Sequence, residues 1–155
     1  MDRTHRYTTV ARWAGSTAPG YTGYDRNHVA QAPPAEQGLE LSGDAAFHGD
    51  ATKLNPEQLL VLSASSCQML SFLAVAARAR IDVLAYDDSA IGEMPDEPRP
   101  QRVARITLRP RITIRGEMPR GTRLLHLVEV AHRECFIANS ITSEIEIQPT
   151  FLRAT

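Results

Sequence analysis

The feature that most constrains the fold of this sequence is one long apolar helical pattern over residues 55–79. Asn55 is a favourable N-cap, Pro56 suits the first helical position, and Glu57 places a carboxylate in the first turn. Apolar residues then continue to Ala79, which predicts a helix of roughly 25 residues, about 37 Å long. A helix that is apolar on every side must be covered on most of them, so we expect a partner chain to help cover it.

A membrane span is the alternative interpretation of the apolar stretch from Leu59 to Ala79, which has about the right length. Polar residues occur throughout the stretch, namely Ser63, Ser65, Ser66, Gln68, Ser71 and Arg78. This content is too polar for a typical span and favours the central helix of a folded domain, with no membrane contact. The first residues, Met1 to Arg6, lack the apolar core of a signal peptide, so we expect a cytoplasmic protein.

The rest of the chain predicts an α+β fold in a single domain over residues 1–155. Alternating or β-branched segments indicate strands at residues 7–14, 24–31, 39–42, 83–94, 103–115 and 141–151. A second amphipathic helix is predicted over residues 122–134, and the first three strands suggest a small antiparallel sheet. The net charge is -1 with 23% charged residues, which gives no sign of a nucleic-acid partner.

The two cysteines, Cys67 and Cys135, are the residues most suited to chemistry. In a reducing compartment both would be free thiols, and either could instead be a small apolar core residue. Cys67 lies ten residues beyond Glu57, about 15 Å along the helix, so the helix N-terminus cannot favour its thiolate. A cationic side chain from another element would have to do so. Arg26 is the candidate, and a solvent-exposed strand arginine is the alternative interpretation.

Other kinds of site find little support in the sequence. His132 and Cys135 share a helix face, but no second Cys/His pair has the spacing of a metal site. There is no phosphate-binding glycine loop, no Gly-x-Ser-x-Gly turn and no Cys-x-x-Cys motif. We therefore expect no metal and no cofactor. For Glu57, the alternative interpretation is a first-turn carboxylate that only offsets the helix dipole.

Two motifs together resemble the OsmC and organic hydroperoxide resistance family, in its OsmC-like branch. The first is the run from Asn55 to Leu60 with a cysteine ten residues after Glu57, and the second is the run Cys135 to Ser140 before the last strand. The resemblance spans roughly residues 24–147. It implies an intertwined α+β homodimer, with antiparallel sheets wrapped around long central helices and active sites at the subunit interface.

By this resemblance, the protein would be a thiol-dependent peroxidase that reduces organic hydroperoxides in the response to oxidative stress. Cys67 would match the peroxidatic cysteine, which forms a sulfenic acid, and Cys135 the resolving cysteine, which forms a disulfide with it. Arg26 would match the catalytic arginine and Glu57 the glutamate that holds it. The reductant would be a dithiol such as a dihydrolipoyl group.

The expected substrate pocket and the departures from the family concern residues near the cysteines. Proximity in sequence suggests Met69, Phe72 and Phe136 as an apolar lining for an alkyl peroxide. In the hydroperoxide resistance branch a proline usually follows the second cysteine, where this chain has Phe136. Relatives in the OsmC-like branch often carry a histidine after the first cysteine, where this chain has Gln68.

Two other functions are compatible with the same residues. A non-catalytic binding protein would keep the cleft for a small apolar or thiol ligand, and its cysteines would be inert to peroxide. A redox sensor would form the disulfide without rapid turnover and change a partner contact. The redox sensor would thus differ from the peroxidase by its rate, and the binding protein would differ from both by cysteines that do not react with peroxide.

Overall fold

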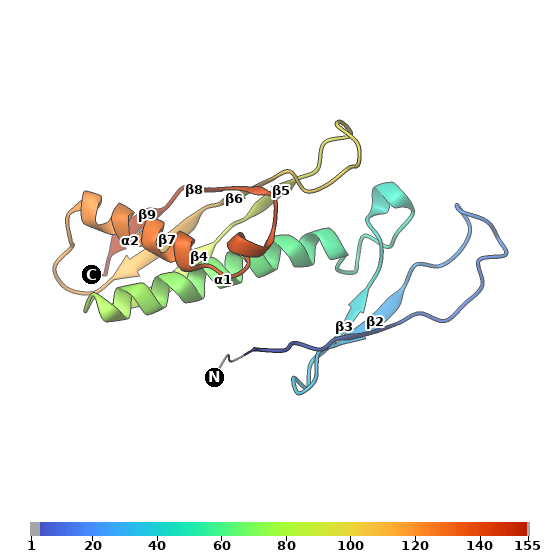
Figure 1. Cartoon of the computed structure of the whole chain (residues 1–155), viewed down its shortest axis with the longest axis horizontal. Coiled ribbons are helices and arrows are strands. Elements are labelled where there is room, and N and C mark those ends of the chain that lie inside the picture. The colour runs from blue at the N-terminus through green and yellow to red at the C-terminus, as the bar shows by residue number, and fades with distance from the viewer. Residues whose placement is uncertain (1–3, 155) are drawn as a thin grey trace. The chain divides into compact units, whose positions relative to one another are not determined.

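The long helix that the sequence predicts is present in the computed structural model as α1 (Pro56–Arg78; Figure 1). Its start follows the expected chemistry. The Asn55 side-chain oxygen accepts from the Gln58 amide at 2.8 Å, and the Gln58 side chain accepts from the Asn55 amide at 3.1 Å. This reciprocal pair is a capping box, which satisfies two amides at the helix start. The predicted start and end of the helix are therefore confirmed to within a residue.

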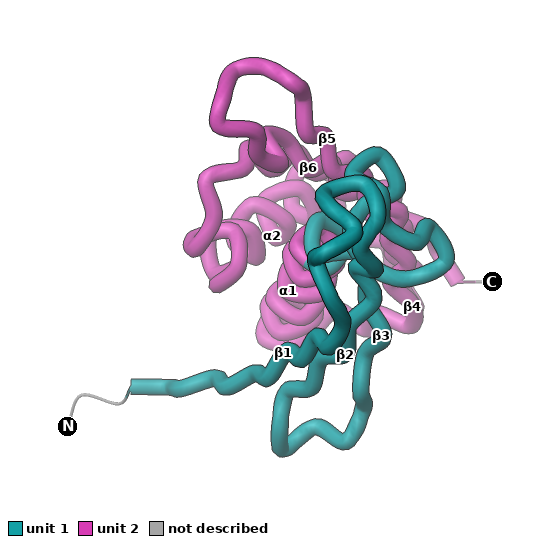
Figure 2. The backbone as a smooth tube through the Cα atoms, turned by 90° about the vertical axis from the view of Figure 1, so that its right-hand side faces the viewer, with its two compact units in different colours: residues 1–59 teal, residues 60–155 magenta. Residues whose placement is uncertain are grey.

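The structure describes residues 4–154, and the chain divides into two compact units, residues 1–59 and 60–155 (Figure 2). The first unit contains an antiparallel sheet of β1 (Val10–Arg12), β2 (His28–Gln31) and β3 (Gly38–Leu41), in that order. A short 3-10 helix, η1 (Ala45–Phe47), follows. The predicted small antiparallel sheet is confirmed; its first two strands are shorter than predicted, and the third is shifted by one residue.

The second unit carries the rest of the elements. In chain order these are β4 (Val83–Asp88), β5 (Ile91–Glu93), β6 (Arg105–Leu108), β7 (Pro110–Ile114), α2 (Gly121–Glu134), η2 (Ala138–Ser140), β8 (Glu144–Ile147) and β9 (Thr150–Arg153). The strands form two sheets in the orders β4-β7-β9 and β5-β6-β8. The predicted α+β class is confirmed.

The pairing in these two sheets corrects the expectation of antiparallel sheets. β4 pairs antiparallel with β7, and β5 with β6, but β8 is parallel to β6 and β9 is parallel to β7. The parallel pairs arise because the chain between β7 and β8 includes α2, a helical crossover of the kind that parallel strands require. Both sheets of this unit are therefore mixed.

Three predicted strands are each divided in two, and local hydrogen bonding explains where. Arg109 separates β6 from β7, and its amide donates to the Asp88 carboxylate at 2.7 Å instead of to a strand. Pro149 has no amide hydrogen to offer a ladder and separates β8 from β9. In the predicted strand over residues 83–94, β4 ends at Asp88, the residue whose carboxylate accepts from the Arg109 amide, and β5 begins at Ile91.

The core of the second unit lies between the helices and the strands. Buried residues from α1, β7 and α2 form one cluster: Phe72, Val75, Ala76, Ile112, Ile114, Leu124, Leu127, Val128 and Ala131. A second cluster contains Ala64 of α1 with Val103, Ile106 and Leu108. By length and a mean hydropathy of 1.8 over its most apolar window, α1 would also suit a membrane span. Its contacts with both clusters identify it as a core helix of this unit.

Candidate functional site

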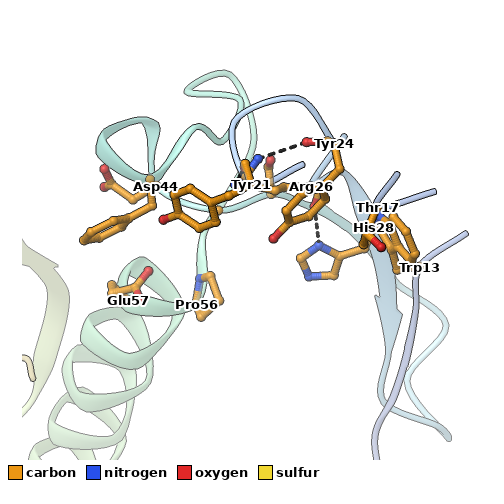
Figure 3. A pocket seen from close by; sticks show the side chains of 12 residues that line it. Trp13, Thr17, Tyr21, Tyr24, Arg26, His28, Asp44, Pro56 and Glu57 are labelled. Carbon is orange, nitrogen blue, oxygen red and sulfur yellow. Dashed lines mark hydrogen bonds between the residues drawn. The ribbon is translucent and has the colours of Figure 1, made fainter. Parts of the chain in front are cut away.

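The first unit holds a cavity of about 490 Å³ that contains two of the predicted site residues, Arg26 and Glu57 (Figure 3). Its other lining residues are mostly aromatic or polar: Trp13, Thr17, Tyr21, Tyr24, His28, Ser42, Gly43, Asp44, Phe47 and Pro56. The cavity thus combines apolar ring surfaces with a cation from one segment and a carboxylate from another. Such a mixture suits an organic ligand with a polar reacting group.

Arg26 is held by the loop that precedes it. Its guanidinium donates to the carbonyl of Tyr24 at 2.9 Å and to the carbonyl of Tyr21. The guanidinium carbon also lies 4.0 Å from the centre of the Tyr24 ring and 5.1 Å from that of Tyr21. Cation–π contact and charged hydrogen bonds both fix a planar guanidinium in place. These contacts also explain why β2 begins only at His28, since residues 24–27 are engaged in the turn.

Other contacts in this unit fix the walls of the cavity. The Trp13 indole donates to the Asp25 carbonyl at 2.7 Å, which ties β1 to the loop of Arg26. Opposite, the loop after β3 closes so tightly that a Cβ atom on Gly49 would lie 1.7 Å from the Gly43 carbonyl oxygen. Glycine is therefore required at position 49 for this close approach. The loop of Arg26 is thus held by the Trp13 indole, and the loop after β3 is held by the close approach of Gly49 to Gly43.

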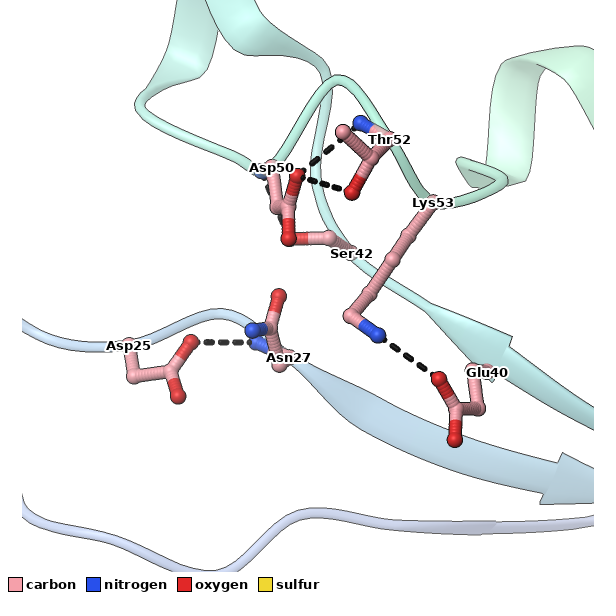
Figure 4. Close-up of polar contacts among 7 residues, drawn as sticks. All are labelled: Asp25, Asn27, Glu40, Ser42, Asp50, Thr52 and Lys53. Carbon is pink, nitrogen blue, oxygen red and sulfur yellow. Dashed lines mark hydrogen bonds and ion pairs between the residues drawn. The ribbon is translucent and has the colours of Figure 1, made fainter.

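Polar contacts continue from the second wall toward the sheet (Figure 4). The Asp50 amide donates to the Ser42 hydroxyl at 3.0 Å, and the Asp50 carboxylate accepts from Thr52. Lys53 donates to Glu40 of β3 at 2.7 Å. This hydrogen bond and the Lys53 charge lower the pKa of Glu40. The sole lysine of the chain is thus engaged in a structural ion pair beside the cavity.

Glu57 lies in the first turn of α1 and lines the same cavity as Arg26 (Figure 3). Among the residues that the structure describes, the ion pairs do not include one between Glu57 and Arg26. The donors of Arg26 are directed to the Tyr21 and Tyr24 carbonyls instead. The two residues predicted to act together therefore share a cavity without being paired.

The two cysteines come together in the second unit. Cys67 is half-buried in α1, and Cys135 is the C-cap of α2 with only 1% of its surface exposed. Burial raises the pKa of Cys135 to about 11. The Ala138 amide, which donates to the Cys135 sulfur at 3.4 Å, acts in the opposite direction. The neighbouring Cys67 contributes a smaller part of the rise in the pKa of Cys135.

Buried polar groups surround this cysteine pair. Gln68 is buried next to Cys67, and its side-chain nitrogen donates to the Val128 carbonyl at 3.5 Å. The Gln68 side-chain oxygen has no hydrogen-bond partner among the described residues. On β4, burial raises the pKa of Tyr86, and the charges of Asp88 and Cys135 add to the shift. The cysteines therefore lie in a buried region, where a hydrogen bond is stronger than it is in water.

The predicted substrate-lining residues divide into three environments. Met69 is half-buried in α1, and Phe136 is 79% exposed just after Cys135. Phe72 is fully buried and packs against Tyr86 and Phe151, with ring centroids 5.9 and 6.5 Å away. Its predicted place in a pocket wall is therefore wrong: packing on both rings makes Phe72 a core residue of the second unit.

Sequence reasoning did not single out the aromatic residues around Arg26. Trp13, Tyr21 and Tyr24 line the cavity, and two of them stack on the guanidinium. The sequence signal that could have identified them is the presence of several aromatic residues in and beside a loop rich in glycine and threonine. Such a loop does not form part of a core, so its aromatic residues are candidates for a binding site. Within residues 4–154, the structure contains no group of three or more His, Cys, Asp or Glu side chains that could hold a metal.

Comparison with known proteins defines the class of this fold. The sequence model of the OsmC-like protein family matches residues 48–150, so the chain belongs to the OsmC-like family. No curated protein matches the sequence. The match includes both cysteines and Glu57 and begins after Arg26.

Solved structures resemble this chain over nearly its whole length. An OsmC-like protein of unknown function from Vibrio cholerae has a TM-score of 0.85 and 26% identity, covering 94% of this chain and 99% of the other. An organic hydroperoxide resistance protein from Elizabethkingia anophelis has a TM-score of 0.70 and 17% identity, covering 99% and 100%. The Legionella pneumophila organic hydroperoxide resistance protein OsmC has a TM-score of 0.66 and 19% identity, covering 96% and 99%. The last two share the fold of this chain.

Proposed function

We propose that this protein is a thiol-dependent peroxidase that reduces organic hydroperoxides with Cys67 and Cys135. The observation that carries the proposal is the proximity of two free thiols from different helices, close enough for Cys67 to raise the pKa of Cys135. A disulfide forms only between cysteines held close together. Family membership and the hydroperoxide resistance proteins of the same fold support the substrate class.

The reaction follows from the exposure of the two sulfurs. Cys67 is the more exposed cysteine, so its thiolate attacks the outer oxygen of the hydroperoxide. The O–O bond breaks, the alcohol leaves with a proton, and Cys67 becomes a sulfenic acid. The Cys135 sulfur then attacks the Cys67 sulfur, the hydroxide leaves as water with the Cys135 proton, and a disulfide forms. An external dithiol such as a dihydrolipoyl group reduces the disulfide by exchange.

Arg26 and Glu57 have the chemistry to support this reaction from their cavity. We assign Arg26 the role of binding the peroxide oxygen. Glu57 would orient the guanidinium, as a carboxylate does when it is paired with an arginine. For this role, the Arg26 guanidinium must give up its hydrogen bonds to the Tyr21 and Tyr24 carbonyls and donate to the Glu57 carboxylate instead. The aromatic rings of the cavity would then contact the organic group of the substrate.

The same proposal includes a homodimer in the cytoplasm. Leu62 and Leu70 on α1 are 56% and 61% exposed, which is high for leucine in a long apolar helix. A second copy of the chain would cover them. A reducing compartment would keep both cysteines as thiols between turnovers.

The test is to treat the reduced protein with one equivalent of tert-butyl hydroperoxide and to follow intact mass and free thiols. We expect rapid loss of two hydrogen atoms and both thiols, with full reversal by dihydrolipoamide. Cys67→Ser should abolish the reaction. Cys135→Ser should react once and leave Cys67 as a sulfenic or more oxidised acid.

Other outcomes would point to the other functions. Unchanged mass with two intact thiols would overturn the peroxidase proposal, and a small thiol that raises the melting temperature would then indicate a binding protein. Formation of the disulfide over minutes, with no turnover by dihydrolipoamide, would indicate a redox sensor. Ser66→Ala, a change on α1 next to Cys67, serves as the control and should react as the unmodified protein does.

A further inference from the structure

Among the described residues of α1 and α2, Gln68 is the one polar side chain that is buried, with 1% of its surface exposed. Its Nε2 donates to the Val128 carbonyl of α2 at 3.5 Å, which is long for a hydrogen bond of this kind, and its Oε1 has no partner among the described residues. An amide that is buried and only half satisfied lowers the stability of a fold. A methionine of similar size would not carry this penalty, so stability does not explain why a glutamine lies here.

The other contacts between the two helices leave their alignment loosely determined. Within residues 4–154, one further side-chain hydrogen bond joins α1 to α2, from Arg78 to Glu134 at 2.5 Å, and these side chains are 60% and 49% exposed. Ion pairs with this exposure contribute little. The remaining buried residues of the two helices are apolar, and apolar contact has no preferred direction.

Gln68 is the group that distinguishes one alignment from another. If α2 slides or rotates on α1, the Gln68 amide nitrogen loses the Val128 carbonyl, and both polar atoms of the side chain are then buried without a partner. A buried polar residue in an otherwise apolar helix interface specifies the register in this way and lowers stability in doing so. The register of α2 on α1 is therefore the property that Gln68 would control.

This register decides how the two cysteines approach each other. Cys67 directly precedes Gln68 on α1, and Cys135 follows Val128 by seven residues, about two turns of α2. A slide of α2 by one turn would move Cys135 by about 5.4 Å. The two Cα atoms of a disulfide usually lie about 4.4–6.8 Å apart, so such a slide is enough to prevent the bond.

We propose that Gln68 is a positioning residue for the disulfide between Cys67 and Cys135, because its amide fixes the register of α2 on α1. The inference rests on the proposed function, in which this disulfide is the second step. It has a distinctive consequence. Loss of the amide should weaken the disulfide without weakening the fold, whereas a residue that serves only packing would weaken both.

The test is to compare the Gln68→Met variant with the unmodified protein in mixtures of oxidised and reduced dithiothreitol at pH 8. In this exchange the two protein thiols lose two hydrogen atoms to oxidised dithiothreitol, which becomes the dithiol. The fraction of protein disulfide in each mixture gives an equilibrium constant. We expect this constant to be about tenfold lower in Gln68→Met. The melting temperature of the reduced variant should be equal or higher, because the half-satisfied amide is gone.

Two further variants separate the hydrogen bond from packing. Gln68→His retains a ring N–H at a similar distance from the backbone, so it should recover most of the lost equilibrium constant. Leu127→Met replaces one apolar side chain of the same helix contact by another and should leave the constant unchanged.

A kinetic measurement assigns the effect to the second step. After one equivalent of tert-butyl hydroperoxide, Cys67 of Gln68→Met should be oxidised as fast as in the unmodified protein. Its sulfenic acid should persist longer and give more adduct with dimedone, because Cys135 attacks it more slowly.

Equal equilibrium constants in Gln68→Met and the unmodified protein would overturn the proposal. A lower melting temperature in Gln68→Met, or an equal loss of the constant in Leu127→Met, would also overturn it and make Gln68 a packing residue. Failure of the peroxidase would be recognised separately, by an unmodified protein that forms the disulfide with oxidised dithiothreitol and does not react with the hydroperoxide. An unmodified protein that forms no disulfide in any mixture would overturn both proposals.

Discussion

At the scale of single residues, the two cysteines differ in ways that follow from their positions in the helices. Cys67 lies in the middle of α1, where its amide and carbonyl belong to the helix and only its side chain can respond to neighbours. Cys135 ends α2, where the backbone turns and free amides of the next residues can reach its sulfur. Cys67 is therefore the cysteine more exposed to a reagent, whereas burial keeps Cys135 as a thiol against the opposite effect of the Ala138 amide.

The raised pKa of Cys135 makes the stability of the protein depend on pH in the alkaline range. Between about pH 9, the ordinary value, and about pH 11, the unfolded chain loses the Cys135 proton while the folded protein keeps it. The free energy of unfolding therefore falls as the pH rises through this window, by up to about 3 kcal/mol. Below pH 9 the contribution is fully present. Chemical denaturation under reducing conditions at several pH values would measure it.

Cys135→Ser is the control for this pH dependence, because serine does not titrate in the window. Groups that do not interact with Cys135 titrate in both proteins and cancel in the difference between them, whereas the pKa of Tyr86 also depends on the charge of Cys135. We expect the two curves of unfolding free energy to converge as the pH rises from 9 to 11. Parallel curves would mean that the buried thiol has an ordinary pKa.

Much of the candidate site could be predicted from single residues, and the rest depends on contacts that a sequence does not display. Cys67, Cys135 and Glu57 carry their signal in fixed spacing within or next to a helix. Arg26 was a candidate because it is a cation in a different element, but its stacking on Tyr21 and Tyr24 arises from a turn whose shape is set by several weak contacts. Phe72 was misplaced because sequence proximity says nothing about which face of a helix is buried.

At the scale of elements, helices were easier to predict than strands. The ends of α1 follow from the capping box and the first proline, which act within a few residues. The parallel pairing of β6 with β8 and of β7 with β9 joins segments separated by α2. Alternation of apolar residues indicates a strand but not its partner, so pairing direction had to come from the structure.

Gly92 of β5 allows close contact between this strand and α1. A Cβ atom on Gly92 would lie 2.4 Å from a methyl group of Val61 and 3.4 Å from one of Val103. We expect Gly92→Ala to destabilise the protein by about 1–3 kcal/mol through this overlap. Thermal denaturation would measure the loss.

A second substitution identifies the cause of this loss. Val61→Ala removes the methyl group that the new side chain meets, so the double variant should recover part of the stability lost by Gly92→Ala alone. Gly121→Ala, at the start of α2, is the matched control, because nothing lies within 4 Å of its Cβ position. Gly121→Ala should not destabilise the protein, because alanine lowers the conformational entropy of the unfolded chain, so equal losses at Gly92 and Gly121 would show that the contact with α1 does not decide the effect.

At the scale of the whole molecule, the exposed leucines of α1 predict that the protein associates with itself. Leu62 and Leu70 lie two turns apart on one face of the helix, and Leu70 is three residues beyond Cys67. We expect a dimer by light scattering after size exclusion. Leu62→Glu or Leu70→Glu should give monomers, because a charge cannot be buried there without a partner.

Leu62→Met and Leu70→Met are the matched variants for this measurement. Methionine keeps the surface apolar and of similar volume, so both should remain dimeric. If the peroxidase needs the second chain, the glutamate variants should also lose peroxide reduction while the methionine variants keep it. Dimeric glutamate variants would place the subunit contact elsewhere on the chain.

The burial of Cys135 also provides the protein with an internal probe of its own motion. A thiol with 1% of its surface exposed can meet a labelling reagent only when the end of α2 and the turn after it separate from the strands. The rate at which Cys135 takes up a label, with Cys67 blocked beforehand, therefore measures how often this region opens under native conditions. In a protein that forms the Cys67–Cys135 disulfide, that frequency would also limit how quickly a bulky external dithiol gains access to the buried sulfur.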